Sequence, residues 1–130
     1  ALAGVDVRLM VPRHCDARLV EWASRSYMME AIEAGVKVYL YEAGFNHSKL
    51  LVSDDKICSC GSTNVDFRSF ENNFEANAFF FDTDMALRIK NIFLEDEAHC
   101  QLTDDVTYYI KRPFLKRLFE STVRLLSPLL

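Results

Sequence analysis

Residues 47–64 read HSKLLVSDDKICSCGSTN, and this stretch says more about the fold than any other part of the chain. Two short runs rich in apolar residues, 49–52 and 56–59, predict two strands. The Ser-Asp-Asp sequence between them, at 53–55, is typical of a hairpin turn. The Gly-Ser-Thr-Asn sequence at 61–64 predicts a loop directly after the second strand.

The same stretch carries the chemistry. His47 and Lys49 are two residues apart, so on a strand they project from one face. A histidine can attack or donate a proton, and a neighbouring lysine can hold anionic oxygens. Ser62 and Asn64 add neutral hydrogen-bond donors suited to the oxygens of a phosphoryl transition state. Together these four residues indicate a phosphate site.

A strand–helix–strand unit is predicted upstream. Residues 5–11 alternate as a half-buried strand does, and residues 16–33 carry apolar residues at helical spacing. Gly35 is the expected helix stop, and residues 36–41 form the next strand. This order favours parallel strands joined by a right-handed crossover.

Downstream, the sequence predicts a strand at 74–81 and a helix at 83–97. A helical region from 103 to 126, interrupted near Pro113, forms a C-terminal helical segment (101–130). The whole chain, 1–130, is predicted to be a single α/β domain, in which a mixed β-sheet is flanked by helices on both faces.

Composition and charge narrow the classes of protein that the chain can belong to. The formal net charge is −4, which argues against a nucleic-acid-binding chain. Basic residues are concentrated after Ile110, where they either contact anionic lipid or form the solvated face of a packed helix. No apolar run reaches the ~20 residues that a membrane span needs, and no signal peptide is apparent. The start without Met indicates a fragment, so a membrane anchor can lie outside it.

The cysteines indicate neither a metal centre nor a disulfide framework. No Cys-x-x-Cys pair is present, and no histidine cluster accompanies the thiols at zinc spacing. We expect reduced thiols, no metal and no cofactor. The four residues are Cys15, Cys58, Cys60 and Cys100.

The pattern His47-x-Lys49, then Asp54, then Gly61-Ser62-x-Asn64 resembles the HKD signature of the phospholipase D superfamily. The likeness continues beyond the motif and extends to both ends of the chain. In these parts outside the motif, the sequence is similar to the C-terminal catalytic half of bacterial-type cardiolipin synthases. The stretches that carry this part are residues 64–70, 73–75, 4–8 and 124–129.

The resemblance implies a role for each site residue. His47 is one of two active-site histidines, of which one attacks phosphorus to form a phosphohistidine and the other protonates the leaving alcohol. Lys49 binds the phosphate oxygens, joined by Ser62 and Asn64. Glu75 is the acid that orients the histidine ring, as a triad carboxylate does.

Asp54 is the third letter of the motif and belongs to the predicted catalytic set. We expect it to make a structural pair near the site rather than to take part in the chemistry. Asp66 and Arg68 are predicted to hold the loop as an ion pair.

Members of the family use two HKD motifs, and this chain has one, because His14 and His99 lack the accompanying spacing. The second half-site therefore comes from a missing N-terminal lobe or from a second copy of the chain in a homodimer. In isolation the chain can be inactive.

The leading hypothesis is a phosphatidyltransferase that makes cardiolipin from phosphatidylglycerol at the cytoplasmic face of the cell membrane, with no nucleic-acid partner. One alternative is a single-motif phosphodiesterase or nuclease acting as a homodimer, which the acidic body argues against. Another is a non-catalytic supporting lobe, which would not require all four of His47, Lys49, Asn64 and Glu75.

Overall fold

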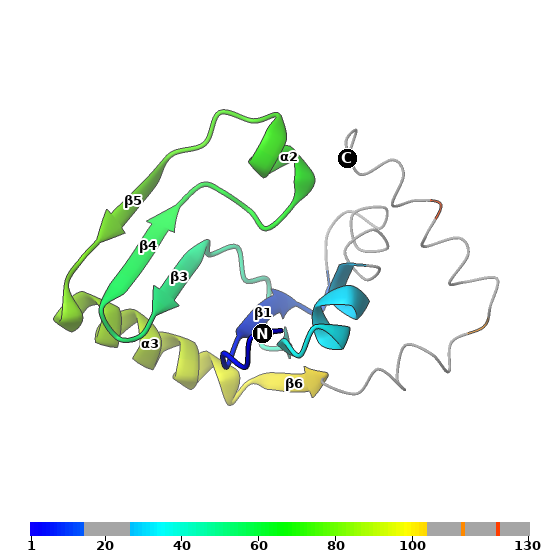
Figure 1. Cartoon of the computed structure of the whole chain (residues 1–130). Coiled ribbons are helices and arrows are strands. Elements are labelled where there is room, and N and C mark those ends of the chain that lie inside the picture. Colours follow the sequence, from blue (N-terminus) through cyan, green and yellow to red (C-terminus); the bar gives the residue numbers. More distant parts are fainter. Residues whose placement is uncertain (15–26, 104–112, 114–121, 123–130) are drawn as a thin grey trace. The chain divides into compact units, whose positions relative to one another are not determined.

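The structure is a computed structural model that describes residues 1–14, 27–103, 113 and 122. The chain divides into two compact units (Figure 1). The first contains Ala1–Phe45 together with the described residues from Cys100 onward, and the second is Asn46–His99. The predicted α/β class is confirmed, but the strands in the described residues form two three-stranded sheets instead of one mixed sheet.

The first unit is built on strands β1 (Arg8–Pro12), β2 (Lys37–Tyr41) and β6 (Cys100–Thr103). Their order is β1-β2-β6, with β1 parallel and β6 antiparallel to β2. The parallel β1–β2 pair confirms the predicted parallel strands, and the handedness of the crossover stays a prediction. The core of this unit surrounds Val38, which is fully buried, and the nearby Ile32.

The helix before β2 ends where the sequence predicts. Residues 27–33 are helical, and Gly35 has a φ of +89°, a conformation that glycine adopts without strain. Its N–H donates to the carbonyl oxygen of Ile32, and the N–H of Val36 donates to that of Ala31, each at 2.9 Å. This pair of bonds is a Schellman motif. The first part of the predicted helix, residues 16–26, lies outside the described part of the chain.

The second unit contains an antiparallel sheet in the order β3-β4-β5. Its strands are β3 (Leu50–Ser53), β4 (Ile57–Gly61) and β5 (Asn77–Phe80), and its helices are α2 (Phe67–Glu71) and α3 (Thr83–Glu97).

The predicted hairpin joins β3 to β4. Asp54 and Asp55 have φ values of 50° and 58°, and the N–H of Lys56 donates to the carbonyl oxygen of Ser53 at 3.1 Å. Two consecutive residues at positive φ define a type I′ turn, whose twist matches that of the flanking strands. Aspartate tolerates this conformation better than most residues do.

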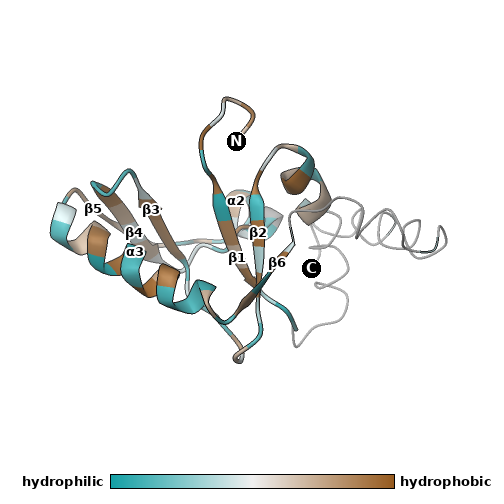
Figure 2. Ribbon diagram, turned by 90° about the horizontal axis from the view of Figure 1, so that it is seen from below, coloured by the Kyte–Doolittle hydropathy of each residue, from teal (hydrophilic) through white to brown (hydrophobic). Residues whose placement is uncertain are grey.

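Helix α3 packs against β3 and β4, and its apolar and polar residues alternate along its length (Figure 2). Asp82 caps its N-terminus by accepting from the N–H of Met85 at 2.7 Å. Ala86 of the helix and Cys58 of β4 are both fully buried. Because side chains alternate along a strand, the face opposite Cys58 carries Leu51 and Phe79, and both of these are exposed.

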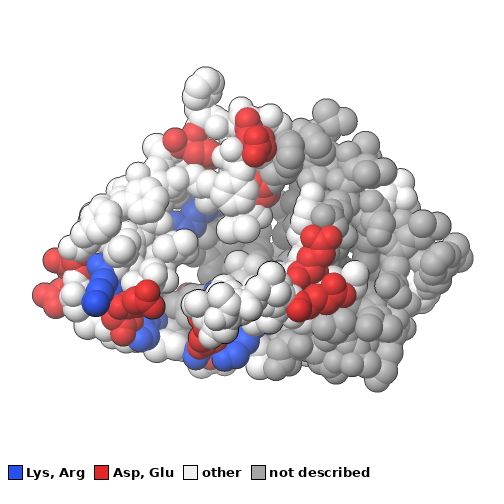
Figure 3. Space-filling model, in the orientation of Figure 1, with Lys and Arg blue, Asp and Glu red and all other residues white. Residues whose placement is uncertain are grey.

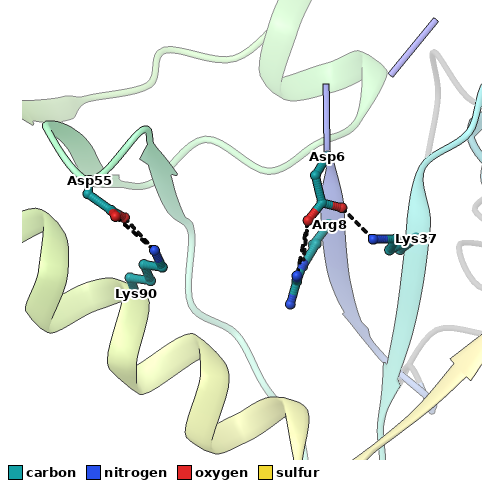
Figure 4. Close-up of polar contacts among 5 residues, drawn as sticks. All are labelled: Asp6, Arg8, Lys37, Asp55 and Lys90. Carbon is teal, nitrogen blue, oxygen red and sulfur yellow. Dashed lines mark hydrogen bonds and ion pairs between the residues drawn. The ribbon is translucent and has the colours of Figure 1, made fainter. Parts of the chain in front are cut away.

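Ion pairs add local links inside each unit (Figure 4). In the second unit, the Lys90 ammonium on α3 contacts both carboxylate oxygens of Asp55 at the hairpin turn, at 2.7 and 2.8 Å. In the first unit, Asp6 binds Lys37 at 2.7 Å and Arg8 at 3.0 Å.

Two predictions of secondary structure need correction. Residues 101–103 belong to strand β6, whereas we expected a helical segment from 101 onward; the rest of that segment is almost wholly outside the described residues. Strand β5 begins at Asn77 instead of residue 74. The reason is local: the N–H of Ala76 donates to the Ser62 hydroxyl at 3.0 Å, so it is not available to a strand ladder.

Candidate active site

His47 and Lys49 lie just before β3, at the end of the sheet where the loop after β4 begins. The N–H of Gly61 donates to the carbonyl oxygen of Lys49 at 3.2 Å, which extends the β3–β4 pairing by one residue pair. The Lys49 ammonium donates to the carbonyl oxygen of His47 at 2.8 Å. His47 is exposed and Lys49 is half-buried, so both can be reached by a ligand.

Ser62 connects the two ends of the long loop between β4 and β5. Its N–H donates to the carbonyl oxygen of Ala76, and its hydroxyl oxygen accepts from the N–H of the same residue, each at 3.0 Å. The Ser62 hydroxyl also donates to the Glu75 carboxylate at 2.5 Å. Ser62 and Glu75, thirteen positions apart in sequence, are therefore in direct contact.

Glu75 is half-buried in a set of donors that favour its charged form. The hydrogen bond from Ser62 is the main cause that lowers the pKa of Glu75 below its usual value, followed by a hydrogen bond from Ser69. Burial acts in the opposite direction with a smaller effect than these two hydrogen bonds, and the amide of Asn73, at 3.3 Å, and the positive charge of Lys49 add smaller lowering effects. Glu75 is thus an anionic hydrogen-bond acceptor at neutral pH.

Gly61 is required by the close approach of β5. A Cβ atom at this position would collide with the carbonyl oxygen of Ala76 and with the side chain of Asn77. That side chain lies over Gly61 and donates from its amide to the Thr63 hydroxyl. The glycine of the motif therefore lets the two strands approach closely enough to bring Ser62 to Glu75.

Asn64 is held through its main chain. Its N–H donates to the Ser69 hydroxyl oxygen at 3.2 Å, while its side chain is exposed. Asp66 caps α2 by accepting from the N–H of Ser69 at 2.7 Å. The predicted pairing of Asp66 with Arg68 stays a prediction.

Asp54 lies at the opposite end of the β3–β4 hairpin from these residues. A strand rises about 3.3 Å per residue, which places Asp54 roughly 16 Å along the chain from Lys49. Its carboxylate accepts from the Ser53 hydroxyl at 3.2 Å. The tether from this turn to α3 is made by its neighbour Asp55. The structure therefore does not bring Asp54 to the other predicted site residues.

The structure thus brings Lys49, Ser62 and Glu75 together, with His47 two residues before Lys49 in the chain. The predicted bond between Glu75 and the His47 ring stays a prediction.

Sequence reasoning missed three polar residues: Asn73, whose amide donates to Glu75; Asn77, whose amide donates to the Thr63 hydroxyl; and Ser69, whose hydroxyl accepts from the Asn64 N–H. Asn73 and Asn77 flank Glu75 at a spacing of two, which places all three on one face of an extended segment, and this signal could have identified them. Ser69 lies in a short helix and gives no such signal.

Figure 3 shows charged side chains of both signs around α3 and an uncharged surface over β5. Within residues 1–14 and 27–103, no group of three or more His, Cys, Asp or Glu side chains could hold a metal ion. No helix in the described part of the chain is long and apolar enough to cross a membrane.

Solved structures place the fold in the phospholipase D class. Nuc, a phospholipase D family member from Salmonella typhimurium, matches with a TM-score of 0.66 at 20% identity, over 78% of this chain and 66% of that one. The phosphatidylserine synthase of Haemophilus influenzae Rd KW20 matches with a TM-score of 0.65 at 16% identity, over 98% of this chain and 36% of that one.

Sequence comparison then gives the particular family. Residues 1–97 match the family model described as cardiolipin synthase, PLD-like domain, and the chain belongs to that family. Over its full length it is 52% identical to the cardiolipin synthase of Geobacillus thermodenitrificans and 50% identical to that of Geobacillus kaustophilus. In each case it spans 26% of the relative, so it corresponds to about a quarter of those proteins.

Proposed function

We propose that this chain supplies one of the two HKD half-sites of a cardiolipin synthase, which transfers a phosphatidyl group between two phosphatidylglycerol molecules. The observation that carries the proposal is the meeting of Lys49, Ser62 and Glu75 beside His47, within a chain about half identical to cardiolipin synthases. The cytoplasmic face of the cell membrane is the proposed location, where the lipid substrate is found.

The proposed reaction has two steps. In the first, an imidazole nitrogen attacks the phosphorus of one phosphatidylglycerol, the bond from phosphorus to the glycerol headgroup oxygen breaks, and a second histidine protonates the released glycerol. In the second, a headgroup hydroxyl of another phosphatidylglycerol attacks the phosphohistidine, and its proton returns to the second histidine. Two phosphatidylglycerol molecules thus give cardiolipin and glycerol, and His47 takes one of the two histidine roles.

The other site residues bind the charged phosphate oxygens or position the histidine ring. Lys49 offers an ammonium group to the phosphate oxygens, and Asn64 offers an exposed amide. Ser62 already donates its single proton to Glu75, so its contribution to phosphate binding requires that proton to be redirected. Glu75, held in its anionic form, is a suitable acceptor for an N–H of a histidine ring.

The second half-site is proposed to come from a paired HKD lobe, either in a longer polypeptide or in a second copy of this chain. The relatives named above are about four times longer than this chain, which supports the first possibility.

A chimeric enzyme tests the function. The matching quarter of the Geobacillus thermodenitrificans cardiolipin synthase is replaced by this chain, and the product is incubated with phosphatidylglycerol in mixed micelles. We expect cardiolipin and glycerol, measured by mass spectrometry. Phosphatidic acid alone would indicate hydrolysis instead of transfer, and no product from a folded chimera would contradict the proposal.

The isolated chain, assayed at increasing concentration, distinguishes the two sources of the second half-site. Activity that rises with the square of the chain concentration would indicate that two copies complete one site.

A further inference from the structure

We propose that Ser69 is a positioning residue that fixes the Asn64 main chain and the Glu75 carboxylate relative to one another. The two arms of the loop between β4 and β5 then present a single rigid phosphate site. This inference rests on the proposed function only in so far as the ligand of that site is a phosphate.

Ser69 is the central hydrogen-bonding group of the loop. It is 6% exposed, whereas Ser62 and Asn64 are exposed. A buried hydroxyl needs partners: the Ser69 oxygen accepts from the N–H of Asn64 at 3.2 Å, and a hydrogen bond from the Ser69 side chain is the second cause of the lowered pKa of Glu75.

The position of Ser69 is itself fixed from both ends of α2. At the N-terminal end, the Asp66 carboxylate accepts the N–H of Ser69 at 2.7 Å. At the C-terminal end, the carbonyl oxygen of Arg68 accepts from the N–H groups of Asn72 and Asn73, at 2.9 and 2.7 Å. A five-residue helix is not stable by itself, so these bonds are what hold Ser69 in place.

Asn64 and Glu75 lie on different arms of the loop. Asn64 follows β4, Glu75 precedes β5, and Ser62 joins the two arms at their base. Ser69 makes a second link further out, between the Asn64 main chain and Glu75. Without its hydroxyl, the side-chain links between the two arms would be those of Ser62 with Glu75 and of Asn77 with Thr63, both close to the strands, and the Asn64 main chain would lose its fixed distance from Glu75.

Nuclear magnetic resonance of the 130-residue chain tests this directly, by comparing the parent with Ser69→Ala and Ser69→Thr. In Ser69→Ala we expect the Asn64 amide to exchange with solvent about tenfold faster, because it loses its acceptor. We also expect the pKa of the Glu75 carboxyl to rise, because it loses a donor. Ser69→Thr retains the hydroxyl and should restore both values.

Two controls separate positioning from general destabilisation. The Leu51 amide in β3 should keep its exchange rate in Ser69→Ala, and Ser59→Ala, the same change in the middle of β4, should leave Asn64 and Glu75 as in the parent. If Leu51 also loses protection, Ser69→Cys replaces Ser69→Ala, because it keeps the side-chain size with only weak hydrogen bonding. Unchanged Asn64 exchange and unchanged Glu75 titration in the folded variant would overturn the proposal.

Titration with inorganic phosphate separates this inference from the proposed function. We expect phosphate to shift the His47 and Lys49 signals of the parent, with about tenfold weaker affinity in Ser69→Ala and recovery in Ser69→Thr. A parent that binds no phosphate would contradict the proposed function, while the Asn64 and Glu75 measurements would still decide the role of Ser69. Unchanged phosphate affinity in Ser69→Ala would contradict the positioning role.

Discussion

Gly61 shows how one residue sets the geometry of the site. The carbonyl oxygen of Ala76 and the side chain of Asn77 occupy the space that a Cβ atom would need, and the first of these is part of the main chain. A substitution therefore has to push β5 away from β4, which also separates Ser62 from Glu75.

We expect Gly61→Ala to lower the free energy of unfolding by about 1–3 kcal/mol, the usual cost of overpacking, as measured by urea denaturation. Gly61→Ala combined with Asn77→Ala should recover only part of this loss, because the Ala76 carbonyl remains. Full recovery in the double variant would mean that the main-chain contact is unimportant.

Asp54 tests whether a residue of the motif matters for its backbone conformation in the turn or for the chemistry of its carboxylate. Its φ of 50° costs most residues about 1–2 kcal/mol and costs glycine very little. We therefore expect Asp54→Gly to unfold at the same urea concentration as the parent or a higher one, and Asp54→Ala to be less stable by about that amount. Loss of transferase activity in a stable Asp54→Gly chimera would instead assign the carboxylate a chemical role.

Asp6 gives a pH dependence in the first unit. Hydrogen bonds from Lys37, first, and from Arg8 lower the pKa of the Asp6 carboxyl. A lowered folded-state pKa stabilises the fold above the unfolded-state value, and this contribution is lost as pH falls through the folded-state value. The melting temperature of the parent should exceed that of Asp6→Asn at pH 6–7, and the difference should disappear on acidification. A difference that stays constant from pH 7 to pH 2 would contradict this account.

At the scale of elements, the hairpin and α3 form one structural support for the site. One end of the hairpin carries Lys49 and Gly61, and the other end is fixed to α3 by the ion pair of Asp55 with Lys90. Both side chains of this pair are more than 40% exposed, so a modest contribution is expected.

A double-mutant cycle with Asp55→Asn and Lys90→Met should give a coupling energy of about 0.2–1 kcal/mol. The coupling should shrink in 1 M salt, where charges are screened within about 3 Å. Arg88→Met, two residues earlier on α3, should show no coupling to Asp55→Asn. Equal coupling from both positions would mean that the effect is not specific to the ion pair.

The elements that the sequence predicted well are those with strong local signals. Helix α3 was predicted with its observed bounds, and the turn at Asp54 and Asp55 was predicted from its residue types. Strand β6 was missed because its buried residue is Thr103, which apolar periodicity does not detect.

The sequence also predicted some residues of the site and not others. The resemblance to a known motif placed Lys49, Ser62 and Glu75 in one site, and the structure brings these three together. The position of Asp54 away from them could not be predicted from spacing alone, because the direction of a strand decides which end of the hairpin a residue occupies. The role of Ser69 depends on the folded loop, so residue types do not reveal it.

At the scale of the whole molecule, the single HKD motif is consistent with a chain that corresponds to part of a cardiolipin synthase. The chain corresponds to about a quarter of the cardiolipin synthases that it resembles, and it carries one set of His47, Lys49 and their partners. In the proposed reaction a second histidine protonates the released glycerol, so pairing with another lobe is part of the proposed function.

The most direct test is the initial rate of cardiolipin formation by the chimera and by two histidine variants of it. We expect His47→Ala to lower the rate by about 10²–10⁴-fold or more, as removal of an essential acid, base or nucleophile does. His99→Ala, an exposed histidine outside the motif, should retain the parent rate. Cardiolipin formed at the parent rate by a folded His47→Ala chimera would contradict the assignment of the active site.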